Sequence, residues 1–132
     1  MISSPNGGLL QLQESMVALS DTQKKYEEEL KLCESNLQQL QTQQIECTLV
    51  LEEVERLEPS RKLYKQIGGA LVPQDIDEAK ISINKRIDFI TGEMNKHESK
   101  SKGLVDKLKE NTSKLKECQD SIMKIMPTSQ KA

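Results

Sequence analysis

Few side chains in this sequence could support metal binding or nucleophilic catalysis. The single histidine is His97, and the cysteines are Cys33, Cys47 and Cys118. No two cysteines have the C-x-x-C spacing of a zinc site, and no Cys, Asp and Glu set with metal-ligand spacing surrounds His97. An odd number of cysteines also argues against a disulfide framework. We therefore interpret the cysteines as small apolar fillers and His97 as a tolerated polar residue.

Other signatures of catalysis are missing from the sequence as well. It contains no Gly-rich phosphate loop, no nucleophile elbow and no paired-carboxylate pattern. The sequence therefore predicts a protein that is not an enzyme, with no catalytic residue, no metal and no cofactor.

The elements that position these side chains are two long helices with a heptad repeat, predicted over residues 9–58 and 75–126. Apolar residues recur at alternating spacings of three and four, which is typical of a left-handed coiled coil. In the first helix this seam is Leu9, Leu12, Met16, Leu19, Gln23, Tyr26, Leu30, Cys33, Leu37, Leu40, Gln44, Cys47, Leu51 and Val54. In the second it is Ile76, Lys80, Ile83, Ile87, Ile90, Met94, His97, Ser101, Leu104, Leu108, Asn111, Leu115, Cys118, Ile122 and Ile125. Residues 1–8 and 127–132 are predicted to be flexible ends.

The two predicted helices are similar in length, so they can fold back on each other as an antiparallel pair. Residues whose numbers sum to about 133 then lie opposite one another, within one helical turn. Gln23 faces Asn111 in this register. Such a polar layer can fix the register of a coiled coil at some cost in stability.

Between the helices, residues 61–73 are predicted to form a β-hairpin. Gly68 and Gly69 supply the backbone freedom of a two-residue turn, and Pro73 is expected to close the second strand. A helix pair needs only a short turn here, and two strands alone are marginally stable in water. We therefore expect the hairpin to assemble with strands of other chains. The residues proposed for assembly are Tyr64, Ile67, Gly68, Gly69, Leu71 and Val72.

Apolar residues also gather at the outer ends of the two predicted helices. Adjacent apolar pairs such as Leu9-Leu10 and Ile125-Met126 exceed what one narrow seam can bury. Exposed, Met-containing tips could bind apolar segments of other proteins, and plain packing of the helix ends is the alternative. The candidate binding residues are Leu9, Leu10, Leu12, Met16, Ile122, Met123, Ile125 and Met126.

Composition excludes several functional classes. The 132 residues are 35% hydrophobic, 2% aromatic and 30% charged, with a net charge of −2 and interspersed signs. That suits long solvated helices better than a compact core. No basic block suggests nucleic acid or a membrane surface, and no apolar run approaches the roughly 20 residues that span a bilayer. Without a signal-peptide pattern, a cytoplasmic location is expected.

Residues 63–72 resemble the single-hairpin signature of the β-class subunits of prefoldin, a hexameric co-chaperone. Residues 83–93, Ile-Asn-Lys-Arg-Ile-Asp-Phe-Ile-Thr-Gly-Glu, resemble the start of the second helix in prefoldin subunit six more than in subunit two. The architecture resembles the family over about residues 9–126, so residues 1–132 are interpreted as one prefoldin-like domain. Two residues depart from the subunit-six pattern: the Gly68-Gly69 turn is what subunit two would show, whereas subunit six more often carries Gly-Pro there, and Pro73 stands where a charged or polar residue is usual.

The resemblance implies a mainly α fold, a long antiparallel two-helix coiled coil with one β-hairpin between the helices. It also implies assembly with two α-class and three further β-class subunits. Together they would hold unfolded proteins such as actin and tubulin at the coiled-coil tips and deliver them to the cytosolic chaperonin, without ATP hydrolysis.

Two other functions are compatible with the residues alone. One is a structural coiled-coil adaptor or tether that binds a folded partner along its helices and uses the hairpin as a turn. The other is an enzyme-associated regulatory subunit without activity of its own.

Overall fold

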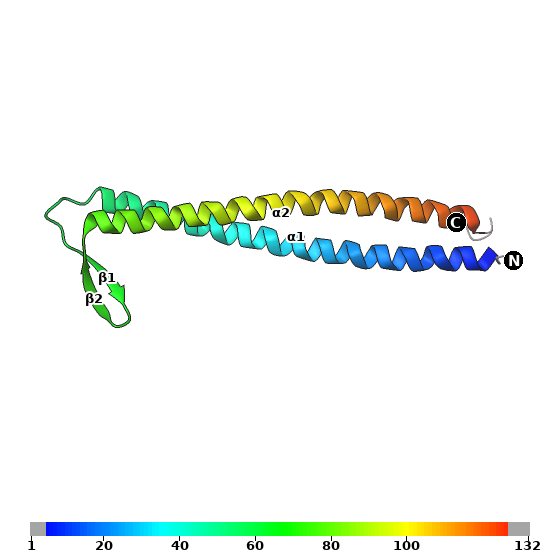
Figure 1. The fold of residues 1–132 in the computed structure, drawn as a ribbon, viewed down its shortest axis with the longest axis horizontal. Helices are drawn as coiled ribbons and strands as arrows, with labels where there is room; N and C mark the ends of the chain where they lie inside the picture. Colours follow the sequence, from blue (N-terminus) through cyan, green and yellow to red (C-terminus); the bar gives the residue numbers. More distant parts are fainter. Residues whose placement is uncertain (1–4, 127–132) are drawn as a thin grey trace. The chain divides into compact units, whose positions relative to one another are not determined.

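The computed structural model describes residues 5–126. Residues 1–4 and 127–132 lie outside the described residues, and with them most of the predicted flexible ends. In chain order the elements are α1 (Pro5–Glu55), β1 (Leu63–Ile67), β2 (Ala70–Gln74) and α2 (Ile76–Ile125) (Figure 1). Two long helices with one antiparallel hairpin between them confirm the predicted fold class.

The element boundaries differ from the predicted ones by a few residues. Helix α1 begins at Pro5 rather than Leu9, because proline is tolerated in the first helical turn, where its missing N–H has no partner to lose. It ends at Glu55 instead of residue 58, and the N–H of Leu57 instead donates to the carbonyl of Val54 in a tighter turn at 3.2 Å. Strand β2 continues through Pro73 to Gln74, and α2 spans 76–125 rather than 75–126.

The chain divides into two compact units, and each unit contains a segment of both helices. Unit 1 consists of Met1–Cys33 and Lys100–Ala132, and unit 2 of Glu34–Ser99. The predicted seam holds in both: every predicted seam residue from Leu9 to Val54 and from Ile76 to Ile122 is half-buried or buried, and only Ile125 is exposed.

Unit 1 contains a hydrogen-bonded polar layer between the two helices. The side-chain amide of Asn111, which is 5% exposed, donates to Oε1 of Gln23 at 2.8 Å and to the main-chain carbonyl of Leu19 at 2.9 Å. Nε2 of Gln23 in turn donates to Oγ1 of Thr112 at 3.2 Å. Buried Cys33, Leu104 and Cys118 supply the apolar contacts. The predicted pairing of Gln23 with Asn111 is therefore confirmed.

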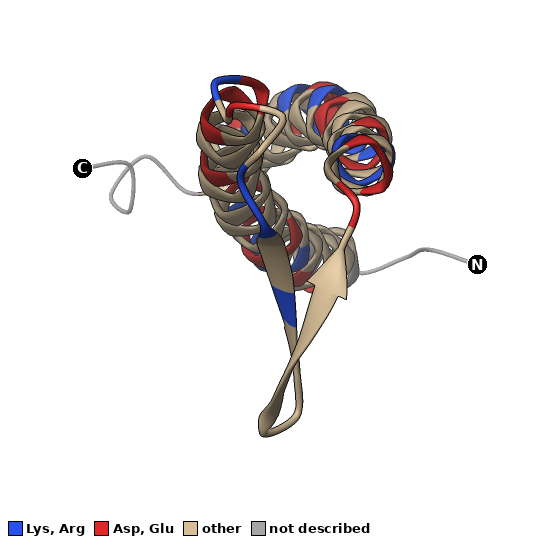
Figure 2. Ribbon diagram, turned by 90° about the vertical axis from the view of Figure 1, so that its left-hand side faces the viewer, with Lys and Arg blue, Asp and Glu red and all other residues tan. Residues whose placement is uncertain are grey.

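Unit 2 has a small core of Val54, Ala79 and Ile90 near the hairpin. Asp75 caps α2, because its Oδ2 accepts the N–H of Glu78 at 3.3 Å and its carbonyl accepts the N–H of Ala79 at 2.9 Å. The hairpin projects from the adjoining ends of the helices without lying against them (Figures 1 and 2).

The hairpin closes through the predicted two-residue turn. Ile67 pairs with Ala70 across Gly68 and Gly69. Gly68 has a φ of 59°, and it is the only described residue with a positive φ. A positive φ at the first central residue alone is the pattern of a type II′ turn. The turn therefore requires glycine at residue 68 and not at residue 69.

We predict that Gly68→Ala weakens the hairpin while Gly69→Ala does not. Both glycines face open space, so an added methyl group meets no neighbour, and the backbone conformation alone separates the two variants. Holding alanine at the positive φ of Gly68 costs about 1–3 kcal/mol. Cross-strand NOEs between Lys65 and Val72 measure the hairpin population. Equal losses in both variants would contradict the turn assignment.

We also predict that Asn111→Ala lowers the free energy of unfolding by about 1–3 kcal/mol. The substitution leaves a cavity and removes the amide N–H group that donates to Oε1 of Gln23. Ser113→Ala is the matched control, since the exposed Ser113 hydroxyl bonds only its own helix at the Lys109 carbonyl. Its effect should stay within about 0.5 kcal/mol. Urea unfolding followed by circular dichroism at 222 nm measures both. The polar layer has no special role if the two variants unfold at the same urea concentration.

Candidate functional site

The hairpin presents most of its apolar side chains to solvent. Tyr64, Ile67, Leu71 and Val72 are between 41% and 69% exposed. These are the non-glycine residues that the sequence analysis assigned to assembly. Leaving such side chains in water forgoes roughly 25 cal/mol per Å² of apolar surface. The structure therefore places a substantial unburied apolar surface at the predicted assembly element.

The strand register distributes this surface over both faces of the hairpin. Ile67 lies opposite Ala70 and Lys65 opposite Val72, so Ile67 and Val72 share one face. Tyr64 and Leu71 alternate with them and occupy the other face. A hairpin packed on its own protein would hide one face. Here neither face is covered by the described part of the chain, so burial needs other chains on both sides.

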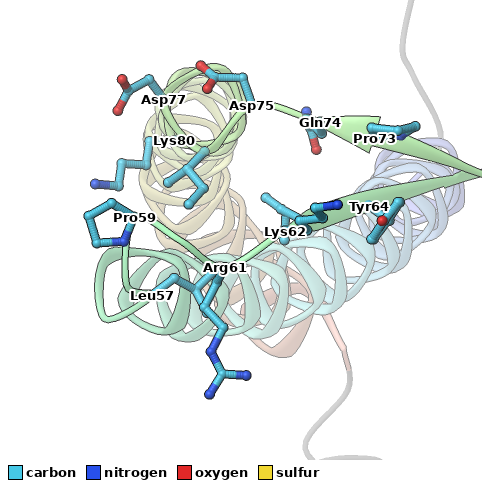
Figure 3. Close-up of a pocket in the computed structure, with 12 residues that line it drawn as sticks. Leu57, Pro59, Arg61, Lys62, Tyr64, Pro73, Gln74, Asp75, Asp77 and Lys80 are labelled. Atoms are coloured by element: carbon cyan, nitrogen blue, oxygen red, sulfur yellow. The ribbon is translucent and has the colours of Figure 1, made fainter.

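A groove of about 680 Å³ lies at the base of the hairpin (Figure 3). The charged residues on its lining do not converge on a common point. Figure 3 shows the Arg61 guanidinium directed away from the groove, and the Asp75 carboxylate is engaged in capping α2. Neither Asp77 nor Lys80 forms an ion pair within residues 5–126. The described side chains that line the groove are therefore not arranged as a pair for acid–base chemistry.

A second groove, of about 470 Å³, extends the hairpin surface onto the helices of unit 2. Tyr64 and Val50 line it together with buried Val54 and Ala79. Val50 is itself exposed. The sequence analysis missed Val50 because it lies outside the heptad seam, and only its apolar type next to a seam residue could have indicated it.

The structure separates the predicted tip residues into two groups. Leu10, Met123 and Ile125 are exposed, as is the neighbouring Val17, with exposed fractions between 38% and 62%. The half-buried members belong to the seam, and they are Leu9, Leu12, Met16, Ile122 and Met126. The Cys118 thiol donates to the Leu12 carbonyl at 3.2 Å, which places the start of α1 beside the end of α2 within unit 1.

The cysteines and the histidine show no arrangement that binds metal. Cys33 and Cys118 are buried, and Cys47 is half-buried. Within the described residues, no three His, Cys, Asp or Glu side chains are grouped so that they could hold a metal ion. The seam positions and burial agree with the interpretation of the cysteines as apolar fillers.

Between residues 5 and 126, neither helix is apolar enough over a sufficient length to cross a membrane.

In unit 2, several apolar side chains outside the seam are exposed. They are Ile45, Leu49, Ile81 and the single phenylalanine, Phe89. The spacing of four between Ile45 and Leu49 was a signal of an apolar patch on α1, and the sequence analysis did not use it.

Comparison with known proteins gives consistent matches. A family model described as prefoldin subunit matches residues 13–122. Prefoldin subunit 6 of Homo sapiens is 37% identical over 70 residues, which cover 53% of this chain and 54% of the human protein. The match thus spans about half the length of that relative. Prefoldin subunit beta of Thermococcus onnurineus is 30% identical over 90 residues, which cover 68% of this chain and 78% of the archaeal protein.

A solved structure agrees with these matches in fold. The crystal structure of the prefoldin beta subunit from Thermococcus strain KS-1 aligns with a TM-score of 0.73 and 26% sequence identity. The alignment covers 78% of this chain and 90% of the archaeal one. Since the family model spans most of the chain and the solved β subunit shares its helices and hairpin, this chain belongs to the prefoldin subunit family.

Proposed function

We propose that this chain is a β-class subunit, most similar to subunit six, of a hetero-hexameric, ATP-independent co-chaperone. The observation that carries the proposal is the hairpin, whose apolar side chains are exposed on both faces. Relatives named as subunits of prefoldin support assembly with other members of the family. The partners would be two α-class and three further β-class subunits, joined through their hairpins.

The proposed task is capture of unfolded proteins, such as actin and tubulin, and their delivery to the cytosolic chaperonin in the cytoplasm. Unfolded chains expose apolar segments of no fixed shape, so a suitable binding surface is apolar and adaptable. The exposed Leu10, Val17, Met123 and Ile125 of unit 1 have these properties. Several such surfaces on one assembly would bind a client through high effective concentration, although each contact is weak.

The adaptor function has one observation in its favour. Ile45 and Leu49 form an exposed apolar pair on α1, outside the seam, where a folded partner could bind along the helix. Native mass spectrometry of the tagged protein distinguishes the two functions. Five further small subunits support the co-chaperone, whereas a single large folded partner supports the adaptor.

We predict that Ile67→Lys combined with Leu71→Lys abolishes assembly and leaves the helices intact. The two changes place a charge on opposite faces of the hairpin, and burying an unpaired charge in an interface is strongly unfavourable. The intact mass of the complex co-expressed with the other prefoldin subunits measures assembly, and circular dichroism measures helicity.

The matched control for the hairpin variant is Leu32→Lys, which places the same charge at an exposed apolar residue of α1 in unit 1. This control should assemble normally. A complex of full mass that still contains the doubly charged hairpin would refute assembly through this element.

We predict that replacing Leu10, Val17, Met123 and Ile125 together by serine weakens client capture about tenfold without breaking the assembly, because apolar contact area is lost. These residues are chosen because they are exposed, whereas changes at half-buried Leu12 or Ile122 would also disturb the seam. Light scattering of chemically unfolded actin diluted into the assembled complex measures capture.

The control for the tip variant carries serine at the same number of exposed apolar positions outside the tip. These positions are Leu32, Ile45, Leu49 and Ile81. The control complex should suppress aggregation as the unmodified complex does. If the tip variant also suppresses aggregation fully, the proposed binding surface is wrong.

A further inference from the structure

We propose that one flank of the helix pair in unit 1 binds segments of unfolded proteins in which apolar residues are followed by acidic ones. The inference rests on the proposed capture of unfolded proteins and names the class of segment that is captured. It follows from two rows of exposed side chains, one on each helix. Both rows change in the same order, from apolar residues at the helix ends to lysines further along.

The helix pair in unit 1 has two flanks, one on each side of the seam. On α2, Lys107 and Thr112 lie to either side of the buried Asn111, because they are four residues before it and one residue after it. The Thr112 hydroxyl accepts a hydrogen bond from Nε2 of Gln23 at 3.2 Å. The Lys107 ammonium lies 5.7 Å from the centre of the Tyr26 ring. We name these sides the Thr112 flank and the Tyr26 flank.

Both helices place lysines on the Thr112 flank. On α2, Lys109 is three residues before Thr112, so the two side chains are neighbours on the same side of the helix. On α1, Lys24 and Tyr26 are one and three residues after Gln23, so they lie to either side of it. Since Tyr26 belongs to the other flank, Lys24 lies on the Thr112 flank.

Each of these lysines belongs to a row of exposed side chains spaced by seven residues, or about two helical turns. From the helix end inward, the row on α1 is Leu10, Val17, Lys24 and Lys31. In the same direction, the row on α2 is Met123, Lys116, Lys109 and Lys102. The Thr112 flank is therefore apolar at the tip and basic behind it on both helices.

The lysines of the two flanks differ in their partners. In the two rows of the Thr112 flank, no lysine forms an ion pair with another described residue. On the Tyr26 flank, by contrast, Lys114 pairs with Glu110 at 3.5 Å, and Lys107 lies over the Tyr26 ring. The positive charge that remains for a bound molecule is thus concentrated on the Thr112 flank.

A solvated surface is the simpler interpretation of exposed lysines. Solvation alone does not account for the same order of apolar and basic side chains on both helices. Acids such as Asp21, Asp106 and Asp120 lie three or four residues from these lysines, but they form no ion pairs with them within residues 5–126. Exposed pairs of this kind are weak even where they form, so the carboxylates of a bound segment can replace them.

The dimensions of the flank suit an extended segment of an unfolded chain. Leu10 and Lys31 are about 30 Å apart along α1, since a helix rises about 1.5 Å per residue. An extended polypeptide covers this length with about nine or ten residues. Such a segment can place aliphatic side chains against the tip and carboxylates beside the lysines. A nucleic acid would satisfy the lysines but has no aliphatic side chains for the tip, so we infer a polypeptide.

Fluorescence anisotropy of two labelled peptides tests the charge preference, on the complex reconstituted with the other prefoldin subunits. Both peptides have a leucine-rich half, and the other half is rich in glutamate in one peptide and in glutamine in the other. We expect the glutamate peptide to bind about tenfold or more tightly at low salt. This advantage should disappear at about 1 M salt, where exposed charges are screened within about 3 Å. Equal affinities at low salt would overturn the inference.

Carbodiimide cross-linking shows which lysines lie beside the bound carboxylates. This reagent joins a carboxylate of the glutamate peptide to a lysine amine in contact with it, and mass spectrometry identifies the lysine. We expect cross-links at Lys24, Lys109 and Lys116 to be at least about fivefold more abundant than those at the lysines of the Tyr26 flank. The two sets are compared within one sample, so the result does not depend on the folding of any variant.

A pair of variants tests the flank by a second route. Three lysines of the Thr112 flank are replaced in Lys24→Gln, Lys109→Gln and Lys116→Gln. The matched control removes the same charge from the Tyr26 flank of the same unit, in Lys25→Gln, Lys107→Gln and Lys114→Gln. We expect the first variant complex to lose about threefold or more in affinity for the glutamate peptide and the control to change less than about twofold.

The outcomes separate this inference from the proposed function. Cross-links spread equally over both flanks, or equal losses in the two variants, overturn the flank assignment and leave client capture standing. A single-stranded oligonucleotide that displaces the glutamate peptide as effectively as the unlabelled peptide does would overturn the assignment to polypeptides. If the complex binds neither peptide but still suppresses the aggregation of unfolded actin, the inference fails alone. If it does neither, the proposed function fails with it.

Discussion

The rest of this structure depends on the narrow apolar seam between two helices. A pair of helices has no enclosed interior, so each helix can bury only the stripe that faces its partner. The residues on that stripe are half-buried or buried from the first turns of α1 to the last turns of α2. Most large apolar side chains outside the stripe, such as Leu10, Leu32 and Phe89, stay in contact with water unless another chain covers them. Where such side chains gather, as they do on the hairpin, they are candidates for contact with other chains.

The register of the seam is defined by polar contacts that run from α2 side chains to α1 carbonyls in unit 1. Asn111 donates to the carbonyl of Leu19, and Cys118, one heptad further along, donates to the carbonyl of Leu12. Both pairs have the same sum of residue numbers, so they specify the same alignment of the two helices. Apolar contacts alone are tolerant of sliding by a heptad. The hydrogen bond from Asn111 to Gln23 is not, because a shift by a heptad would take the Gln23 side chain away from the amide of Asn111.

The hairpin adds to the helix pair an apolar surface that the described part of the chain leaves exposed. Its exposed side chains are distributed over both faces by the alternation of the strands. In the proposed assembly, the hairpin supplies specificity, and the exposed helix ends of unit 1 supply weak and adaptable contacts to clients.

Local spacing in the sequence determined much of this protein. The heptad seam, the two-residue turn and the pairing of Gln23 with Asn111 were predictable, because each depends on residue type and separation along the chain. Helix boundaries were less predictable, since Pro5 is compatible with both a loop and a first helical turn. Only the tertiary structure decided the exposure of the last tip residues. Ile125 belongs to the predicted seam and Met126 does not, and yet Ile125 is exposed and Met126 is half-buried. The groove at the hairpin also required the structure, because residues far apart in the chain, such as Val50, Tyr64 and Ala79, line it together.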